Sequence, residues 1–355
     1  MKKKVLYITN LPAPYKVDYF NELGKYTDLT VIFERSKAKN RASAWSSSAS
    51  SEGFKTVFLS GIDIGDEMSV DVSIIKYLMQ NRDSLILLNG YSSPTEMLAI
   101  LYMKAHHVAF GLVCDGLLIK EESAFVRWLK EILISSASFW LSSGRETDKV
   151  LTEHGADGSK IFRYPFSSVH EYDIASVPYN RKEVKDAVGC KSKYMILYVG
   201  QMIHRKGIDL LLEAVTGIDM DFQLYLIGDQ IPFSNEKVVN IGFLDKYTLK
   251  KYYMASDLFV LPSREDIWGL VVNEAMGYGV PVIATDRCGA ALEMVKNGKN
   301  GVIVPAGDVC ALQEKIVSIL KQQESTPFML NAVDTAKNYT IEKMAECTWE
   351  IIRQL

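Results

Sequence analysis

The chain has 355 residues, of which 48% are hydrophobic and 23% charged, a composition typical of a globular protein, and its length predicts about two domains. The net charge is −3, and basic and acidic residues are balanced in both halves, which excludes an arm that binds nucleic acid regardless of sequence. The five cysteines form no CxxC motif, which argues against a zinc site or a disulfide framework and indicates a reducing compartment.

The first ten residues, MKKKVLYITN, contain a basic cluster but too short an apolar region for a signal peptide. We interpret them as the start of a first strand. No apolar run approaches the roughly 18–20 residues that span a bilayer. We therefore expect a soluble cytoplasmic protein, and contact with the inner face of a membrane stays open.

Short apolar runs alternate with helical patterns along the whole chain. The runs typical of strands occupy residues 4–9, 29–34, 85–90, 107–114, 137–143, 195–200, 222–228, 238–244, 258–263 and 281–285. This alternation predicts parallel sheets covered by helices. Two successive doubly wound units fit the pattern better than one very large sheet.

A polar stretch over residues 164–193 has no strand pattern and marks the break between the two units. The predicted parts are a first domain over 1–170, a linker over 171–193, a second domain over 194–337, and a C-terminal helix over 338–355 that returns to the first domain. A Ser- and Lys-rich segment at 36–53 is typical of a binding loop or a disordered loop.

Two unusual loops follow strands of the second half. Arg205 and Lys206 lie after the strand at 195–200, just before Gly207 and a helix. The second loop follows the strand at 258–263 and leads into a helix that begins near Gly269. Ligands of doubly wound sheets bind outside the carboxyl ends of the strands, and a helix N-terminus offers free N–H groups. Two cations and a helix N-terminus predict a diphosphate site.

Two carboxylates accompany this predicted site. Asp266 lies in the turn before the helix, and Glu274 lies about a turn and a half inside it. The five positions from Gly269 to Glu274 cover about 7–8 Å, which suits two ends of one extended ligand. Losing one hydrogen bond to a charged group costs about 1.5–3 kcal/mol. We therefore interpret the two carboxylates as a clamp on the hydroxyls of a nucleotide sugar.

Each of these residues also has an ordinary interpretation. Arg205 and Lys206 alone would be a solvated basic pair. Asp266 alone would be a helix cap, and Glu274 a surface residue of a helix. Their joint position at two strand ends of one domain favours the ligand site. No metal is predicted, because the histidines lack ligand spacing and the acidic triplet at 219–221 precedes a strand, where a turn needs polar residues.

The motifs of the second half follow one another in a specific order. They are VGQMIHRKG (199–207), LYLIGD (224–229), VNIGFL (239–244), LPSREDIWGLVVNEAMGYGVPVIAT (261–285) and GKNGVIVPAGD (298–308). This order covers most of residues 195–310 and resembles the nucleotide-sugar domain of the family 4 glycosyltransferases, which have the GT-B fold. The resemblance implies an α/β protein with two doubly wound Rossmann-like domains that face each other across a cleft.

The resemblance also implies retaining transfer from a nucleoside diphosphate sugar, without a cofactor or an essential metal. It assigns the pyrophosphate to Arg205 and Lys206. It assigns the donor-sugar hydroxyls to Asp266, with Glu265 as a stand-in, and the ribose to Glu274. The other donor-binding residues that it implies are Gly200, Gly228, Phe243, Trp268, Gly269 and Leu270.

Two positions depart from the family pattern. The family usually has Glu where Asp266 stands, so the reach to the sugar is one methylene shorter. It often has Arg where Gln201 stands. Arg205 and Asp266 keep the required charges in place.

In the first half, across residues 1–160, the resemblance is looser. The loop TNLPAPYKVDYFNEL (9–23) is similar to a subset of polysaccharide-assembly transferases, and its Asn10, Tyr15 and Lys16 are the predicted acceptor-binding residues. Asp115 follows the strand at 107–114, where many relatives carry a histidine. We expect it to contact the transferred sugar or the acceptor hydroxyl, and an ordinary turn aspartate is the alternative.

The segment AFVRWLKEILI (124–134) has apolar and charged residues at helical spacing. It could rest on a membrane surface, where a lipid-linked acceptor would be found. Such a stripe more often belongs to a core, and we expect core.

The predicted function is a transferase of hexosyl or related groups, from a UDP-linked donor to a glycan or lipid-linked acceptor. Capsule, exopolysaccharide or O-antigen assembly is the context that the resemblance implies. Two alternatives stay open, a sugar-nucleotide epimerase and a sugar-nucleotide-binding relative without turnover. A nicotinamide-dependent dehydrogenase is disfavoured, because neither half has GxGxxG between a strand and a helix.

Overall fold

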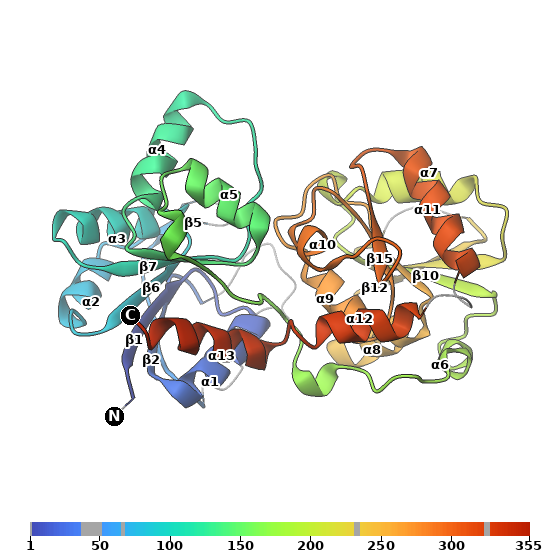
Figure 1. The fold of residues 1–355 in the computed structure, drawn as a ribbon, viewed down its shortest axis with the longest axis horizontal. Helices are drawn as coiled ribbons and strands as arrows, with labels where there is room; N and C mark the ends of the chain where they lie inside the picture. Colours follow the sequence, from blue (N-terminus) through green and yellow to red (C-terminus); the bar gives the residue numbers. More distant parts are fainter. Residues whose placement is uncertain (1, 37–51, 65–67, 231–234, 323–326) are drawn as a thin grey trace. The chain divides into compact units, whose positions relative to one another are not determined.

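The computed structural model describes residues 2–36, 52–64, 68–230, 235–322 and 327–355 (Figure 1). Most of the Ser- and Lys-rich segment predicted at 36–53 lies outside the described residues. The chain divides into two compact units. The first consists of Met1–Ser167 with Ile341–Leu355, and the second consists of Ser168–Thr340.

The first unit is built on a seven-stranded parallel sheet in the order β3-β2-β1-β6-β7-β8-β9. Its strands are β1 (Lys4–Thr9), β2 (Asp28–Phe33), β3 (Lys55–Phe58), β6 (Leu85–Asn89), β7 (Phe110–Cys114), β8 (Phe139–Ser142) and β9 (Ile161–Arg163). Its helices are α1 (Pro14–Tyr26), α2 (Ile74–Gln80), α3 (Pro94–Ala105), α4 (Ala124–Ile134), α5 (Arg145–Glu153) and α13 (Ile341–Ile352). An antiparallel hairpin of β4 (Ile62–Ile64) and β5 (Met68–Val70) follows β3.

The second unit has a six-stranded parallel sheet in the order β12-β11-β10-β13-β14-β15. Its strands are β10 (Tyr194–Gly200), β11 (Phe222–Gly228), β12 (Val238–Gly242), β13 (Leu258–Leu261), β14 (Val282–Thr285) and β15 (Gly301–Val304). Its helices are α6 (Arg181–Ala187), α7 (Ile208–Thr216), α8 (Lys246–Ala255), α9 (Leu270–Gly277), α10 (Gly289–Met294), α11 (Val309–Gln322) and α12 (Phe328–Ala336).

The strand order reverses once in each sheet, between β1 and β6 and between β10 and β13. At such a point the loops that follow the two strands run in opposite directions, which leaves a crevice at the carboxyl ends of the strands. Doubly wound folds bind their ligands in this crevice. We call these two places the switch points. Of the loops predicted to carry the chemistry, those after β1, β10 and β13 start at the switch points, whereas the loop with Asp115 follows β7, the neighbour of β6.

The central strands are apolar on both faces because helices cover both sides of a doubly wound sheet. In β10 the run Met195–Tyr198 is fully buried, and it pairs in register with β11 and with β13. The predicted strands at 195–200 and 222–228 are therefore confirmed to within one residue.

The C-terminal helix α13 belongs to the first unit and lies along α1 (Figure 1). The hydroxyl of Tyr19 donates to Thr348 Oγ1 at 3.1 Å, and Tyr26 stacks on Trp349. The residues predicted as a linker, 171–193, belong to the second unit and contain α6.

The segment predicted as core at 124–134 forms α4, but the core expectation is wrong for its first half. Phe125 is 68% exposed and Trp128 55%, whereas Leu133 and Ile134 are buried. Helical spacing alone does not distinguish a stripe that faces a core from one that faces solvent. Among the described residues, no helix is both long and apolar enough to cross a membrane.

Candidate functional site

The two loops at the second switch point lie against each other. The amide of Arg264 donates to the carbonyl of Arg205 at 2.9 Å, and Arg205 Nη1 donates to the carbonyl of Glu265 at 3.0 Å. The first loop ends in a 3₁₀ turn, His204–Lys206, before α7 begins. The structure therefore brings together the basic pair and the acidic stretch, which lie about 60 positions apart in the sequence.

Glycines make the close approach of these loops feasible. Gly207 has a φ of 68°, and a Cβ there would lie 2.0 Å from the carbonyl oxygen of Pro262. Gly269 has a φ of 93° and occupies the N-cap of α9, as the sequence predicted. A side chain at either position would strain the left-handed backbone, and at Gly207 it would also push the two loops apart.

Lys206 and Asp266 form an ion pair at the second switch point. The distance from Lys206 Nζ to Asp266 Oδ2 is 2.5 Å, and the two side chains are 15% and 10% exposed. The amide of Asp266 donates to the carbonyl of Arg287 at 2.8 Å, which fixes its backbone beside β14. Lys206, predicted to contact the phosphates, therefore contacts Asp266, predicted to contact the donor sugar. The charges of the two side chains balance each other.

Arg264 is a third cation at this switch point, and sequence reasoning assigned it no role. Its guanidinium donates to both carboxylate oxygens of Asp209, at 2.7 and 2.6 Å, and to the carbonyl of His204. This bidentate pair connects the β13 loop to the start of α7. The sequence shows that Arg264 directly follows the strand predicted at 258–263. It does not show the ion pair, because the partner Asp209 lies 55 positions away.

Glu274 is half-buried on α9, and two hydroxyls contact its carboxylate. Tyr253 donates to Oε2 at 2.9 Å, and Ser168 donates to Oε1 at 3.2 Å. Loss of solvent raises the pKa of Glu274, while the two hydroxyls oppose that shift. A carboxylate held in this way has a fixed orientation and further lone pairs for ribose hydroxyls.

The other predicted donor-binding residues are distributed around the same strand ends. Gly228 ends β11, Phe243 follows β12 and is 59% exposed, and Leu270 is the first residue of α9. Trp268 is buried, and its indole N–H donates to Asn273 Oδ1 at 3.1 Å. The indole nitrogen therefore already has an acceptor within the second unit.

The first switch point holds a polar cluster around Lys16. Its ammonium donates to Thr9 Oγ1 at 2.8 Å and to Asn89 Oδ1, and it lies 3.5 Å from Asp115 Oδ2. The hydroxyl of Tyr164 donates to Asp115 Oδ1 at 2.6 Å. The structure therefore brings together the predicted Lys16 and Asp115 and adds three partners that sequence reasoning missed.

Asn10 directly follows β1, and Tyr15 is the second residue of α1. Asn10 Oδ1 accepts from Arg35 Nη2 at 3.3 Å, and the ring of Tyr15 meets Phe166 edge to face at 5.7 Å between centroids. Tyr15 and Asn10 are both partly exposed, so each retains surface for a ligand.

A pair of buried carboxyl groups lies at the same edge of the first sheet. Ser93 connects them, since its hydroxyl donates to Glu34 Oε1 at 2.7 Å and its amide donates to Glu96 Oε2 at 2.9 Å. Burial, together with the charge of Glu34, raises the pKa of Glu96 to about 7. The S-x-x-E spacing of Ser93 and Glu96 is a capping box and was visible in the sequence, but the contact with Glu34 was not.

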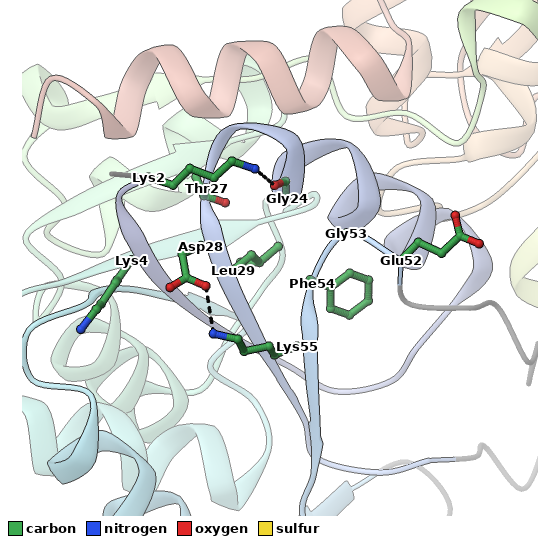
Figure 2. A pocket seen from close by; sticks show the side chains of 10 residues that line it. All are labelled: Lys2, Lys4, Gly24, Thr27, Asp28, Leu29, Glu52, Gly53, Phe54 and Lys55. Carbon is green, nitrogen blue, oxygen red and sulfur yellow. Dashed lines mark hydrogen bonds and ion pairs between the residues drawn. The ribbon is translucent and has the colours of Figure 1, made fainter.

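A hollow of about 590 Å³ lies elsewhere in the first unit, and Figure 2 shows the residues that line it. Lys4, Asp28 and Lys55 line it, and these residues begin or closely precede β1, β2 and β3. It therefore opens at the amino ends of the strands, whereas doubly wound folds bind ligands at the carboxyl ends. None of the predicted site residues lines it.

Comparisons with known proteins decide the family. The sequence profile of the family described as Glycosyl transferases group 1 matches residues 193–322. An uncharacterized glycosyltransferase of Methanocaldococcus jannaschii is 31% identical over 293 residues, which cover 78% of this chain and 82% of that protein. The chain belongs to the group 1 glycosyl transferases.

Other relatives of the chain match over shorter lengths. The lipopolysaccharide core biosynthesis mannosyltransferase LpsB of Rhizobium meliloti is 28% identical over 200 residues, covering 50% of this chain and 57% of that protein. An uncharacterized protein of the cps region of Klebsiella pneumoniae is 34% identical over 136 residues, covering 37% of each. The chain thus spans about half, or less, of the length of these two relatives.

Solved structures confirm the predicted fold class. Sucrose-phosphate synthase of Thermosynechococcus elongatus matches with a TM-score of 0.78 and 17% identity over 99% of both chains. HepE of Anabaena, in complex with UDP, matches with a TM-score of 0.79 and 14% identity over 99% of this chain and 100% of that chain. The chain therefore has the GT-B fold, with two Rossmann-like domains.

Within the described part of the chain, no three His, Cys, Asp or Glu side chains gather as a set of metal ligands. Asp221, from the acidic triplet at 219–221, accepts from the amide of Lys193 at 3.0 Å. That contact gives the aspartate a place in the turn before β11.

Proposed function

We propose that this glycosyltransferase is a retaining enzyme of family 4 that uses a nucleoside diphosphate sugar, UDP-linked, as its donor. It transfers the sugar to a hydroxyl of a glycan or lipid-linked acceptor in the cytoplasm. It works without a cofactor or an essential metal. The transfer belongs to the assembly of a capsule, an exopolysaccharide or an O-antigen.

One observation carries the proposal, namely the convergence of Arg205, Lys206 and Asp266 beside the N-terminus of α9 at the second switch point. A diphosphate carries its charge on oxygens that accept hydrogen bonds from cations and from free N–H groups of a helix start. Cations aimed at a departing phosphate stabilise the charge that develops in the transition state. The same residues therefore bind the donor and promote the loss of its leaving group.

The transfer is a substitution at the anomeric carbon. The bond from that carbon to the phosphate oxygen breaks, and the diphosphate leaves with the bonding electrons. The bond from the acceptor oxygen to the same carbon forms, and the proton of the acceptor hydroxyl passes to the departing diphosphate or to solvent. Arg205 and Lys206 neutralise the charge that the leaving group gains.

Lys206 and Asp266, which form an ion pair, have different roles in the proposed donor site. A diphosphate competes for the ammonium more strongly than one carboxylate does, because it brings more negative charge within reach. The Lys206 ammonium then turns toward the phosphates, and the Asp266 carboxylate accepts hydrogen bonds from the hydroxyls of the sugar. Glu274, oriented by Tyr253 and Ser168, accepts from the ribose.

The first unit supplies the acceptor side of the proposed reaction. Asp115 and Lys16 lie at its switch point, and Asp115 is oriented by the hydroxyl of Tyr164. A carboxylate held in this way can accept a hydrogen bond from a neutral sugar hydroxyl. Asn10, directly after β1, and Tyr15, at the start of α1, flank this point and would contact the body of the acceptor.

The comparisons support the donor and the context. HepE, which shares the fold, is described in complex with UDP. LpsB is described as a mannosyltransferase of lipopolysaccharide core biosynthesis, and the Klebsiella pneumoniae relative lies in a cps region. These descriptions favour a uridine nucleotide and a polysaccharide product for this chain.

Nucleotide release by the purified chain tests the proposal. The donors are a panel of UDP-, GDP- and ADP-sugars, each with and without EDTA. Slow release of UDP from one UDP-sugar, unchanged by EDTA, is the expected result. Release that EDTA abolishes would overturn the metal-independent assignment, and conversion of the sugar nucleotide without release would establish the epimerase alternative. A donor that raises the melting temperature without being consumed, even with extracted glycolipid acceptors added, would indicate a binding protein without turnover.

A further inference from the structure

The first half of α4 is an exposed apolar tip. Phe125, Val126 and Trp128 are 68%, 41% and 55% exposed, and their centre is the contact between the Phe125 and Trp128 rings at 5.8 Å. We call these three residues the α4 tip. In Figure 1, α4 extends outward from the sheet of the first unit, and a long loop connects its start to β7.

The base of the helix is fixed firmly to the first unit. Ile134 is buried, and its carbonyl accepts from the indole of Trp140 at 3.0 Å. Glu122, just before the helix, forms an ion pair with Lys130 and a hydrogen bond with His154 Nε2 at 3.1 Å. The α4 tip is therefore part of a helix whose base is held in place. Its apolar side chains stay in contact with solvent, so the protein lacks the stability that burying them would give.

The size of the tip distinguishes between two kinds of partner. A large aromatic side chain buries about 150–250 Å² in full, so the exposed parts of the two rings amount to roughly 200–300 Å². A stable protein interface buries about 800 Å² on each partner. A small apolar tip flanked by charged residues suits insertion into the headgroup region of a bilayer, where tryptophan is enriched and a few side chains suffice.

We propose that the α4 tip inserts into the surface of a lipid bilayer and attaches the first unit to it. The chain passes from Asp115, at the carboxyl end of β7, through residues 116–123 to α4, so the tip and the proposed acceptor site lie at the same edge of the first sheet. This placement would present a lipid-linked acceptor to Asp115, a consequence that rests on the proposed function. The attachment itself does not rest on it.

Charge around the tip determines which lipids it takes. Arg127 Nε lies 3.2 Å from Glu131 Oε1, and Lys130 pairs with Glu122, so the cations of α4 are already neutralised by partners. Attraction to an anionic surface needs basic residues in excess. Insertion is therefore driven by the apolar tip, and it depends weakly on anionic lipid and on salt.

Flotation of the full chain with vesicles tests the inference without any donor or acceptor. The vesicles are phosphatidylcholine alone and an equimolar mixture of phosphatidylcholine and phosphatidylglycerol, each at low and high salt. We expect comparable flotation under all four conditions. The variant F125S/W128S should lose at least about tenfold in partitioning, because it removes most of the apolar area of the tip.

The matched control is Ile62→Ser, which removes a residue that is 74% exposed on the β4–β5 hairpin of the same unit. It should float like the unaltered chain. A cooperative thermal unfolding transition establishes that each variant is folded. No flotation of the unaltered chain, flotation that F125S/W128S retains, or flotation with anionic vesicles at low salt only would each overturn the inference. A dimer that F125S/W128S abolishes would also overturn it and would identify a second copy as the partner.

Discussion

Replacement of Lys206 by alanine tests the donor site most sharply, because it should affect stability and turnover for separate reasons. The ammonium lies 2.5 Å from Asp266, and the two side chains are only 15% and 10% exposed. Truncation leaves the Asp266 carboxylate nearly buried without its cation. Removing one partner of such a pair costs about 2–4 kcal/mol of unfolding free energy, which lowers the melting temperature by roughly 5–10 °C.

Turnover should fall for a different reason. Lys206 is proposed to neutralise the departing diphosphate, and losing one such contact costs about 10²-fold or more in rate. The double variant K206M/D266L removes both charges and replaces them with apolar side chains of similar length. It should recover most of the lost stability and stay inactive, which separates folding from chemistry.

The assays are thermal unfolding and nucleotide release from the preferred donor. Lys315→Ala is the matched control, since its ammonium lies 2.8 Å from Glu314 and both side chains are well exposed. Such a surface pair contributes about 0–1 kcal/mol, so this variant should keep both properties. Near-normal turnover of Lys206→Ala would refute the donor assignment, and an equal loss of stability in the single and double variants would refute the reasoning about the pair.

Three further outcomes follow from the two switch points. Glu274→Ala should cut nucleotide release by roughly 10²-fold, while the circular dichroism spectrum stays unchanged. Burial raises the pKa of Glu96 from 4.5 to about 7, so between these values the folded chain keeps a proton that the unfolded chain has lost, and stability falls as pH rises through about 7. The melting temperature should therefore fall between about pH 4.5 and pH 7, level off above that range, and lose most of that slope in Glu96→Gln. Tyr164→Phe removes the 2.6 Å hydrogen bond to Asp115 and should lower kcat by about tenfold, with an unchanged thermal shift by UDP, if Asp115 acts in transfer rather than in donor binding.

The sequence predicted the parts of the fold that local patterns determine. Strands such as β10 are apolar on both faces, and the helix after Gly269 begins where the left-handed glycine ends the turn. Short strands were missed, because β3, β9 and β15 contain only three or four residues and lie at sheet edges. An edge strand needs less apolar sequence than a central strand, since one side of it has no neighbouring strand.

The partners of the site residues could not be predicted in the same way. Tyr253 lies 21 positions and Ser168 106 positions from Glu274, so no local pattern connects them. Only the fold brings the two hydroxyls to the carboxylate. The same holds for Tyr164 and Asp115, which lie 49 positions apart.

The two switch points differ in how their lysines are held, and this difference bears on which substrate each suits. Lys16 donates to two neutral oxygens, of Thr9 and Asn89, and lies 3.5 Å from Asp115. Its charge is spread over several acceptors, which ties the ammonium in place. Lys206 instead contacts the carboxylate of Asp266 directly at 2.5 Å.

The two switch points also differ in the charged groups that they hold. The first switch point holds Glu34, Glu96 and Asp115 beside the cations Lys16 and Arg35, so it has no excess of positive charge to attract an anionic diphosphate. The second offers Arg205 and the helix start of α9, which attract an anion. This difference supports the proposed roles, with the neutral hydroxyl of the acceptor at the first switch point and the anionic donor at the second.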